Sequence, residues 1–299
     1  MNVTTFIASK YLIGGTNNDV RVWQVADGKQ VATIPIGTDN GVNCVATSED
    51  GQWIAGGTKR GEVFVWNAKT YQQLFVDRSG REPIHDVDFS PDSTRLVSAD
   101  NGGTIWDIAA CQKVRTLDHD RSVVAAKYSP QGDRIATATE KSVRVWDSKD
   151  GHLLVDVKVR VKGWRSLPWC RNHLFVQTYD GTIKRINAAT GSTVSEWSVP
   201  QDARRRSAIT LPPHGKFIAY SAEKSITIWD AATHAQLSII PHTHDIFSFA
   251  FSPDDSLLAI ANVGSQIIVK KLFQSVFVRS YSIFNSSLLS LGVTPHPRT

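Results

Sequence analysis

The densest group of side chains able to bind a charged ligand is Arg204-Arg205-Arg206. Guanidinium groups match phosphate and carboxylate oxygens with paired hydrogen bonds, so these arginines, together with Arg165, could bind a phosphorylated or acidic segment. A solvated loop is the simpler interpretation of the same residues. Three arginines also fall short of the basic surface that nucleic acid requires, so we do not expect nucleic acid as a ligand.

Two further groups resemble reactive sites but have simpler explanations. The segment His242-Thr243-His244-Asp245 lacks a third ligand at a metal-binding spacing. The glycine-rich stretch 56–61 is expected to form a turn between strands, with no following helix to hold a phosphate. Nucleophile elbows, phosphate-binding loops, zinc-protease helices and dinucleotide fingerprints are absent from the sequence. We therefore expect a non-catalytic protein without a metal or cofactor.

The organisation of the chain follows from a repeated apolar segment that ends in tryptophan and a polar residue. Successive copies are 43, 40, 40, 40 and 43 residues apart, with isoleucine in the fifth. A seventh, eroded copy follows at 267–270. Such a period marks a repeat architecture. The anchor residues are Trp23, Trp66, Trp106, Trp146, Ile186 and Trp229.

A turn motif recurs in phase with these anchors. Phe89-Ser90-Pro91-Asp92 and Phe251-Ser252-Pro253-Asp254 each come about 17 residues before an anchor position, and each is followed by a short apolar run. Every unit therefore has the pattern of four short strands joined by Pro, Gly and Asp turns. One such sheet cannot bury both faces, whereas sheets stacked radially can. We predict an all-β, seven-bladed propeller of four-stranded antiparallel blades.

The tryptophan-ending strand and the Phe-Ser-Pro-Asp turn resemble the WD-repeat (WD40) family, from about residue 10 to 272. The resemblance implies a hydrogen-bonded set of His, Ser or Thr, Asp and Trp in each blade. Here the set is incomplete in every unit, so apolar burial must hold the blades together and blades 5 and 7 are expected to be degenerate. The third unit has Ser98, Asp100 and Trp106, with Gly80 in place of the histidine. The fourth has His119 and Trp146, with Ala138 and Glu140 at the other two places. The fifth has Thr178 and Asp180, with Ile186 in place of the tryptophan, and the seventh has His242.

The propeller is expected to occupy residues 1–283, and the segment 284–299 matches no repeat. Because about ten residues precede the strand at 11–15, the last blade should take its outer strand from its own C-terminal side, near 275–282. Ring closure would then depend on packing between blades. Approximate blades are 1–36, 41–78, 84–118, 122–161, 163–199, 204–240 and 245–283.

The family's usual binding face surrounds the mouth of the channel, so the resemblance implies that residues starting the inner strands or preceding the turn Asp line it. Tyr, Arg and exposed Phe are typical of protein-binding hot spots. The alternative is that these are ordinary loop residues. The candidates are Asn43, Lys59, His85, Arg165, Tyr179, Arg204, Arg205, Arg206, Ser207 and Phe247.

The alternating run Val157-Lys158-Val159-Arg160-Val161-Lys162 is interpreted as an outer strand whose charges protect a sheet edge. The three cysteines are widely spaced, which favours a reducing compartment. With no secretory leader pattern, we expect an intracellular protein, cytoplasmic or nuclear and without a membrane partner. The mild excess of positive charge, +5, is spread along the chain. The expected partners are proteins or peptides, including acidic or phosphorylated ones, bound by a monomeric scaffold. A propeller enzyme with its site at the channel mouth is a less favoured alternative, because the sequence supplies no convergent set of carboxylates or histidines for it.

Overall fold

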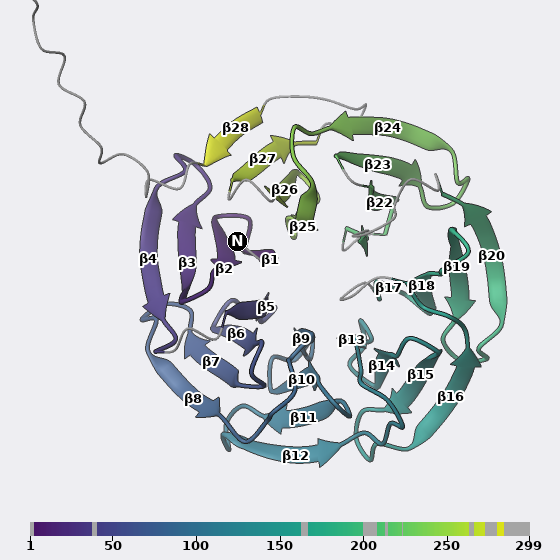
Figure 1. Ribbon diagram of the computed structural model, residues 1–299, viewed down its shortest axis with the longest axis horizontal. Helices are drawn as coiled ribbons and strands as arrows, with labels where there is room; N and C mark the ends of the chain where they lie inside the picture. Colours follow the sequence, from purple (N-terminus) through teal and green to yellow (C-terminus); the bar gives the residue numbers. More distant parts are fainter. Residues whose placement is uncertain are drawn as a thin grey trace, which may run out of the picture.

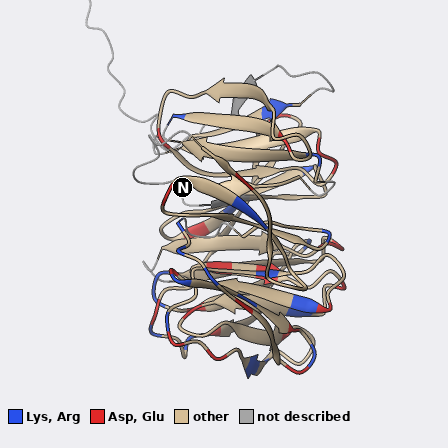
Figure 2. Ribbon diagram, turned by 90° about the vertical axis from the view of Figure 1, so that its right-hand side faces the viewer, with Lys and Arg blue, Asp and Glu red and all other residues tan. Residues whose placement is uncertain are grey.

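Seven four-stranded antiparallel sheets surround a central channel in the computed structural model (Figure 1). The structure describes residues 3–37, 41–162, 167–199, 208–212, 215–222, 224–262, 266–272 and 280–283. Within these residues every helix or strand assigned is a strand. Seen from the side, the sheets form a disc (Figure 2). The predicted fold class is confirmed, whereas the exact limits of the blades stay a prediction.

Each sheet is built from four consecutive strands, ordered from the channel to the rim. The first three blades contain β1 (Val3–Ile7), β2 (Tyr11–Gly15), β3 (Asp19–Gln24) and β4 (Gln30–Pro35); β5 (Val42–Thr47), β6 (Trp53–Thr58), β7 (Val63–Asn67) and β8 (Gln73–Asp77); and β9 (Asp86–Phe89), β10 (Arg95–Ala99), β11 (Thr104–Asp107) and β12 (Gln112–Thr116). Blades 4 and 5 contain β13 (Ala125–Tyr128), β14 (Arg134–Ala138), β15 (Ser142–Asp147) and β16 (Leu153–Lys158); and β17 (Trp169–Cys170), β18 (His173–Gln177), β19 (Thr182–Asn187) and β20 (Thr193–Ser198). Blades 6 and 7 contain β21 (Ile209–Thr210), β22 (Phe217–Ala222), β23 (Ser225–Asp230) and β24 (Gln236–Pro241); and β25 (Ile246–Phe251), β26 (Leu257–Asn262), β27 (Ile267–Lys271) and β28 (Ser280–Ile283).

Apolar side chains fill the junction between each pair of neighbouring blades. The third strand of a blade points its anchor residue toward the preceding blade: Trp106 packs with Val65, and Trp146 with Val97. Ile186 occupies the same place toward blade 4. Burying a large side chain of this kind contributes about 1.5–3 kcal/mol, which is why the anchors recur with the blade period.

The ring closes without a strand lent by the N-terminus. In blade 7, β28 pairs with β27, and blade 1 keeps all four of its own strands. Phe6, Leu12 and Trp23 of blade 1 share a buried cluster with residues of blade 7, including Leu257 and Val269. Packing between blades therefore closes the circle.

Opposite the anchor residue, the outer strand of six blades contains a bulge. Two outer-strand residues then face one residue of the third strand, and the extra residue is left beside the ladder. The extra residue is apolar and exposed in all six cases, which explains most of the large apolar side chains on the rim. These residues are Val31, Leu74, Val114, Leu154, Val194 and Leu237.

The two faces of the disc are defined by the antiparallel order of the strands. Connections between blades and turns between second and third strands lie on one face, called here the loop face. Turns between first and second strands and between third and fourth strands lie on the other, called here the turn face. The loop face contains Asn43, Lys59, His85, Tyr179 and Phe247, the predicted binding residues that the structure describes, and the turn face contains the Ser-Pro-Asp turns.

Candidate functional site

Three predicted binding residues meet on the loop face at the junction of blades 2 and 3. Asn43 donates a 2.8 Å side-chain hydrogen bond to the carbonyl of Ile84, the residue before His85. The backbone N–H of Lys59 donates to Gly41 at 3.0 Å, and that of Ile84 donates to Thr58. Lys59 is exposed, whereas His85 is only 6% exposed. His85 is therefore placed to support this surface more than to contact a partner.

The remaining predicted residues are distributed over the other blades. Phe247 is the second residue of β25 and is half-buried. Tyr179 follows β18 and is 50% exposed. Arg165, Arg204, Arg205, Arg206 and Ser207 lie outside the described residues.

An aromatic and cationic platform forms around Tyr179. The Arg160 guanidinium carbon lies 5.1 Å from the centroid of the Tyr179 ring, and the Tyr179 N–H donates to the Arg160 carbonyl at 3.2 Å. The backbone of Lys141 adjoins the same connection, because its carbonyl accepts a 3.1 Å hydrogen bond from the Val159 N–H. We call Lys141, Arg160 and Tyr179 the Tyr179 platform. The platform brings together the turn between the second and third strands of blade 4, the connection from blade 4 to blade 5, and the turn between the second and third strands of blade 5.

Arg160 was missing from the predicted binding residues because the run 157–162 was interpreted as one outer strand. That interpretation is wrong: β16 ends at Lys158, and Val161 forms a bridge with Thr178 of the next blade. The strand therefore ends midway through the run, and Arg160 is carried onto the connection beside Tyr179. A bulky aromatic residue next to the Asp-Gly turn was the only local signal of this contact.

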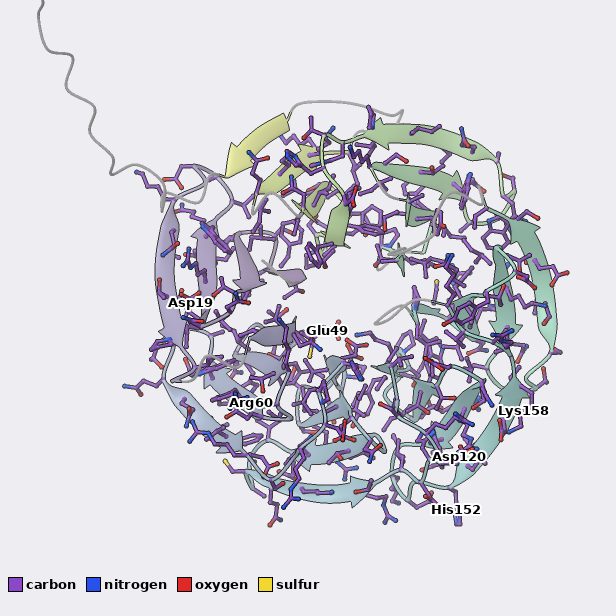
Figure 3. All side chains as sticks on the ribbon, in the orientation of Figure 1. Asp19, Glu49, Arg60, Asp120, His152 and Lys158 are labelled. Carbon is purple, nitrogen blue, oxygen red and sulfur yellow. The ribbon has the colours of Figure 1, made fainter. Side chains whose placement is uncertain are left out.

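Most charges near the platform neutralise one another. Arg144 contacts Asp120 at 3.4 Å and Asp156 at 3.3 Å, and Asp156 also pairs with Lys158 at 2.8 Å. Figure 3 shows Asp120 and Lys158 on this sector of the ring. No ion pair joins Arg160 or Lys141 to a carboxylate in the part of the chain that the structure describes.

The inner strands of blades 3 and 4 are joined by a charged cluster. Lys127 lies 3.3 Å from both Asp86 and Asp88, and Asp88 accepts a 2.8 Å hydrogen bond from the Tyr128 N–H. Burial raises the pKa of Asp88 and opposes the effect of the nearby Lys127 ammonium. Burial alone would lower the pKa of Lys127, but the two carboxylates raise it well above its ordinary value. Each charge is matched by its neighbours, which is the arrangement of a structural tie between blades.

The tryptophan hydrogen bonds differ from the predicted set in one blade. Trp106 Nε1 donates to Ser98 Oγ at 2.9 Å, and Asp100 accepts from Thr104 at 3.0 Å. In blade 4, however, Trp146 Nε1 donates to Thr137 at 2.7 Å. The assignment of Ala138 to this place is therefore wrong by one residue.

Two histidines that the resemblance singled out have different surroundings. His119 Nε2 lies 3.0 Å from the Thr137 hydroxyl, and its ring meets Trp146 edge-on. Burial lowers the pKa of His119 to about 4. The His242 ring lies 3.2 Å from the His244 carbonyl in its own loop, while the His242 backbone N–H donates to the Lys224 carbonyl of blade 6. Burial lowers the pKa of His242 as well. In blade 5, Thr178 donates to Asp180 while Ile186 stays buried.

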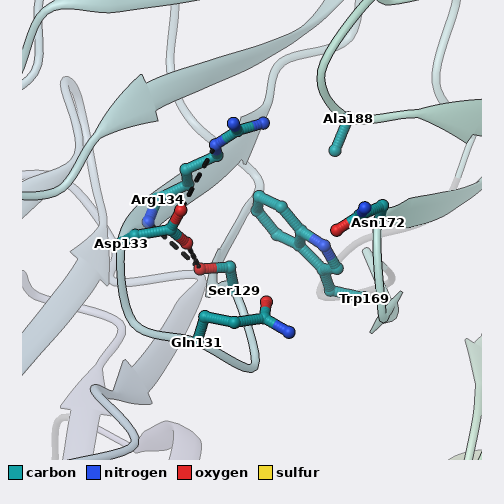
Figure 4. Close-up of a pocket in the computed structure, with 7 residues that line it drawn as sticks. All are labelled: Ser129, Gln131, Asp133, Arg134, Trp169, Asn172 and Ala188. Carbon is teal, nitrogen blue, oxygen red and sulfur yellow. Dashed lines mark hydrogen bonds and ion pairs between the residues drawn. The ribbon is translucent and has the colours of Figure 1, made fainter.

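A pocket of about 180 Å³ opens on the turn face, between blades 4 and 5 (Figure 4). Trp169 and Asn172 of blade 5 face Gln131, Asp133 and Arg134 of blade 4. None of the predicted binding residues lines it. The pocket arises where one blade departs from the repeat, and a search for recurring sequence motifs does not detect such a local difference.

The described residues form neither a metal cluster nor a membrane-spanning helix. No three His, Cys, Asp or Glu side chains gather as a metal site within the described ranges. Among the same residues no helix has the length and apolarity needed to span a membrane. The three cysteines are free thiols, buried at Cys44, exposed at Cys111 and half-buried at Cys170.

Comparison with known proteins places this geometry among WD40 propellers. Residues 5–201 match the family model described as nucleolar protein 10-like, N-terminal domain. The chain is 18% identical to the RRP9 WD40 repeats, with a TM-score of 0.76 over 87% of this chain and 86% of that one. A chain of the mitotic checkpoint complex gives a TM-score of 0.79 at 20% identity, over 92% and 87%. These structures establish the shared fold.

The chain is also similar in sequence to proteins with different described roles. The pre-rRNA-processing protein crb3/ipi3 of Schizosaccharomyces pombe is 28% identical over 135 residues, 38% of this chain and 30% of that protein. The COMPASS component SWD3 of Saccharomyces cerevisiae is 24% identical over 213 residues, 66% of this chain and 67% of that protein. The chain thus spans less than a third of the first of these relatives and about two-thirds of the second.

Proposed function

Because the chain belongs to the family of nucleolar protein 10-like N-terminal domains, which are WD40-type β-propellers, we propose that it is a non-catalytic scaffold that binds a partner protein on its loop face. Relatives and structural neighbours of the chain are components of protein complexes, which supports protein partners. The similarity to pre-rRNA-processing proteins supports a nuclear location.

The Tyr179 platform is the observation that carries this proposal. Tyr and Arg are enriched among the few residues that dominate the energetics of protein interfaces. Here the Arg160 guanidinium already lies over the Tyr179 ring, so little conformational freedom is lost when a partner binds. Tyr179 remains 50% exposed beneath its arginine, which leaves one face of the ring for a contact.

The surroundings of the platform support a rigid surface. Val161 is bridged to Thr178, and the Val161 N–H donates to Glu140 at 3.1 Å. Backbone bonds on both sides therefore hold Arg160 between blades 4 and 5. Side chains on such a frame keep their positions when a partner binds, which favours specificity.

Affinity purification with the full chain tests this proposal. We expect Tyr179→Ala/Arg160→Ala to reduce capture of the specific partners about tenfold, as loss of a hot-spot pair does. Lys149→Ala/His152→Ala removes one cation and one ring from the turn face, where both are exposed, and should leave capture unchanged. Thermal unfolding of each variant verifies the fold. Equal partner lists for all three proteins would contradict the proposal, as would catalytic activity of the purified propeller.

Recognition of a phosphorylated or acidic segment is a second candidate. It is supported by Lys141 and Arg160, which no described carboxylate neutralises, and by the sequence cluster Arg204 to Arg206 with Arg165. Phosphopeptide arrays would show a preference for phosphorylated over unmodified peptides. Alanine at the four cluster positions should abolish that preference, and an unchanged pattern would rule out this candidate.

A further inference from the structure

The pocket between blades 4 and 5 arises from a shortened turn. In blade 4, Tyr128 pairs with Ile135, seven positions later, across the Ser-Pro-Gln-Gly-Asp turn. In blade 5, Trp169 pairs with Leu174, only five positions later. The shorter turn places Arg171 at φ +51° and leaves the indole of Trp169 beside the turn of blade 4. Because the turn of blade 5 is two residues shorter than that of blade 4, it leaves an opening in the turn face.

The neighbouring junction shows what normally fills this space. Arg95 begins the second strand of blade 3, and its Nη1 donates a 3.2 Å hydrogen bond to the carbonyl of Ser148 in blade 4. Arg134 holds the equivalent place in blade 4, since Arg95 pairs with Asp107 and Arg134 with Asp147 in the same register. The carbonyl equivalent to that of Ser148 belongs to Ala188.

The equivalence of Ser148 and Ala188 follows from their backbone bonds. The Ser148 N–H donates to Asp133 at 3.0 Å, and the Ala188 N–H donates to Asn172 at 2.9 Å. Each hydrogen bond joins the start of the turn between a blade's third and fourth strands to the end of the turn between its first and second strands. Ala188 lines the pocket, but Arg134 does not fill the place that Arg95 fills one junction earlier.

Asp133 explains why Arg134 is held elsewhere. In blade 3 the turn aspartate, Asp92, stands two residues after Ser90 and accepts its hydroxyl at 2.5 Å. In blade 4 that position is Gln131, and Ser129 instead donates to Asp133, four residues on, at 2.7 Å. Asp133 then lies next to Arg134, with 3.6 Å between Arg134 Nε and Asp133 Oδ2. The contact with Asp133 holds Arg134 at the edge of the pocket (Figure 4).

Besides the cation Arg134, the pocket is lined by groups that suit a second cation: the carboxylate of Asp133 and the indole of Trp169. Asp133 is 60% exposed, and its contact with Arg134 is long for an ion pair, so the carboxylate can accept a further donor. The indole of Trp169 forms one wall, and its N–H already donates to Arg171 at 2.9 Å, which leaves the ring face for contact. A guanidinium stacks on an indole and bonds carbonyl and carboxylate oxygens in its own plane.

We propose that this pocket receives an arginine side chain of a partner protein, in the place that Arg95 holds between blades 3 and 4. The site lies on the face opposite the Tyr179 platform and does not depend on it. A partner could therefore engage the turn face while another occupies the loop face, which would make the propeller a bridge between two proteins.

Fluorine NMR of the full chain labelled with 5-fluorotryptophan tests the pocket directly. The resonance of Trp169, one of nine tryptophans, is assigned by its loss in Trp169→Phe. The probes are the capped tripeptide Gly-Arg-Gly and its citrulline analogue, which has nearly the same shape without the charge. We expect the arginine peptide to shift the Trp169 resonance saturably and the citrulline peptide to leave it in place.

Variants of the pocket separate the possible results. Asp133→Asn should weaken binding of the arginine peptide about fivefold, and Asp150→Asn, which removes an exposed carboxylate of the same face, should not. The eight other fluorine resonances report whether each variant stays folded. Equal shifts with both peptides, or unchanged binding by Asp133→Asn, would overturn the proposal. Binding seen only in Arg134→Ala would also overturn it, because Arg134 would then fill the pocket itself.

Discussion

The indole nitrogen of Trp146 donates a 2.7 Å hydrogen bond to the Thr137 hydroxyl, inside the junction of blades 3 and 4. Thr137→Val keeps the shape of the side chain but leaves the indole N–H buried without an acceptor. We predict that it lowers the free energy of unfolding by about 1–3 kcal/mol, measured by urea denaturation. Thr116→Val, at an exposed position of β12, should change it by less than about 0.5 kcal/mol. Equal effects would show that the bond contributes nothing.

His119, which contacts the same hydroxyl, should make stability depend on pH. Burial lowers its pKa from 6.5 to about 4, so between these values the unfolded chain binds more protons than the folded chain. The stabilisation is complete above pH 6.5 and is lost as the pH falls toward 4. We expect the wild type to lose about 1–2 kcal/mol more than His119→Gln between pH 7.5 and pH 5. His152→Gln, at an exposed site, serves as the control, and parallel pH profiles would contradict this prediction.

The charged cluster on the inner strands should be sensitive to loss of its cation. Lys127→Met leaves the carboxylates of Asp86 and Asp88 facing each other in a partly buried site. We predict a loss of about 3 kcal/mol in the free energy of unfolding, because the remaining charges are no longer compensated. Lys113→Met on the exposed outer strand β12 should be nearly neutral. Adding Asp88→Asn to Lys127→Met should restore part of the loss.

A glycine at the junction of blades 2 and 3 sets how closely these sheets approach. A Cβ on Gly57 would lie 2.4 Å from Ile84 Cγ2 and 2.7 Å from Cys44 Sγ. We predict that Gly57→Ala destabilises the protein by about 1–3 kcal/mol through overpacking. Ile84→Ala removes the nearest clashing atom, Cγ2, but keeps the Ile84 Cβ at 2.6 Å from the new methyl group. The double variant should therefore lose somewhat less stability than the two single losses added together. If calorimetry shows that the losses in the free energy of unfolding of the two single variants simply add in the double variant, the steric explanation is wrong.

Much of the architecture was predictable because its signals are local. A buried tryptophan, a Ser-Pro-Asp turn and alternating apolar residues each depend on a few neighbouring positions. Their common period of about 40 residues leaves stacked sheets as the solution that buries every apolar face. Trp106 illustrates this, because its indole is buried against the preceding blade, as stacked sheets require.

The hydrogen-bond partners of the anchors were less accessible from the sequence. Ser98 and Thr104 pair across a turn six positions long, whereas Thr137 and Arg144 pair across one of seven. Counting back from the tryptophan by the spacing of blade 3 therefore gives Ala138 in blade 4, one residue short of Thr137. A single added turn residue changes which side chain faces the indole.

The sequence by itself determined the repeat, the strand pattern and the residues that must be buried, because these depend on the order of apolar and turn-forming side chains. Only the tertiary structure decided that Arg160 stacks on Tyr179 and that the pocket beside Trp169 stays open. Both features lie between blades, where side chains far apart in the chain meet. Their geometry depends on where one strand ends and how long the next turn is, and no periodic pattern carries that information.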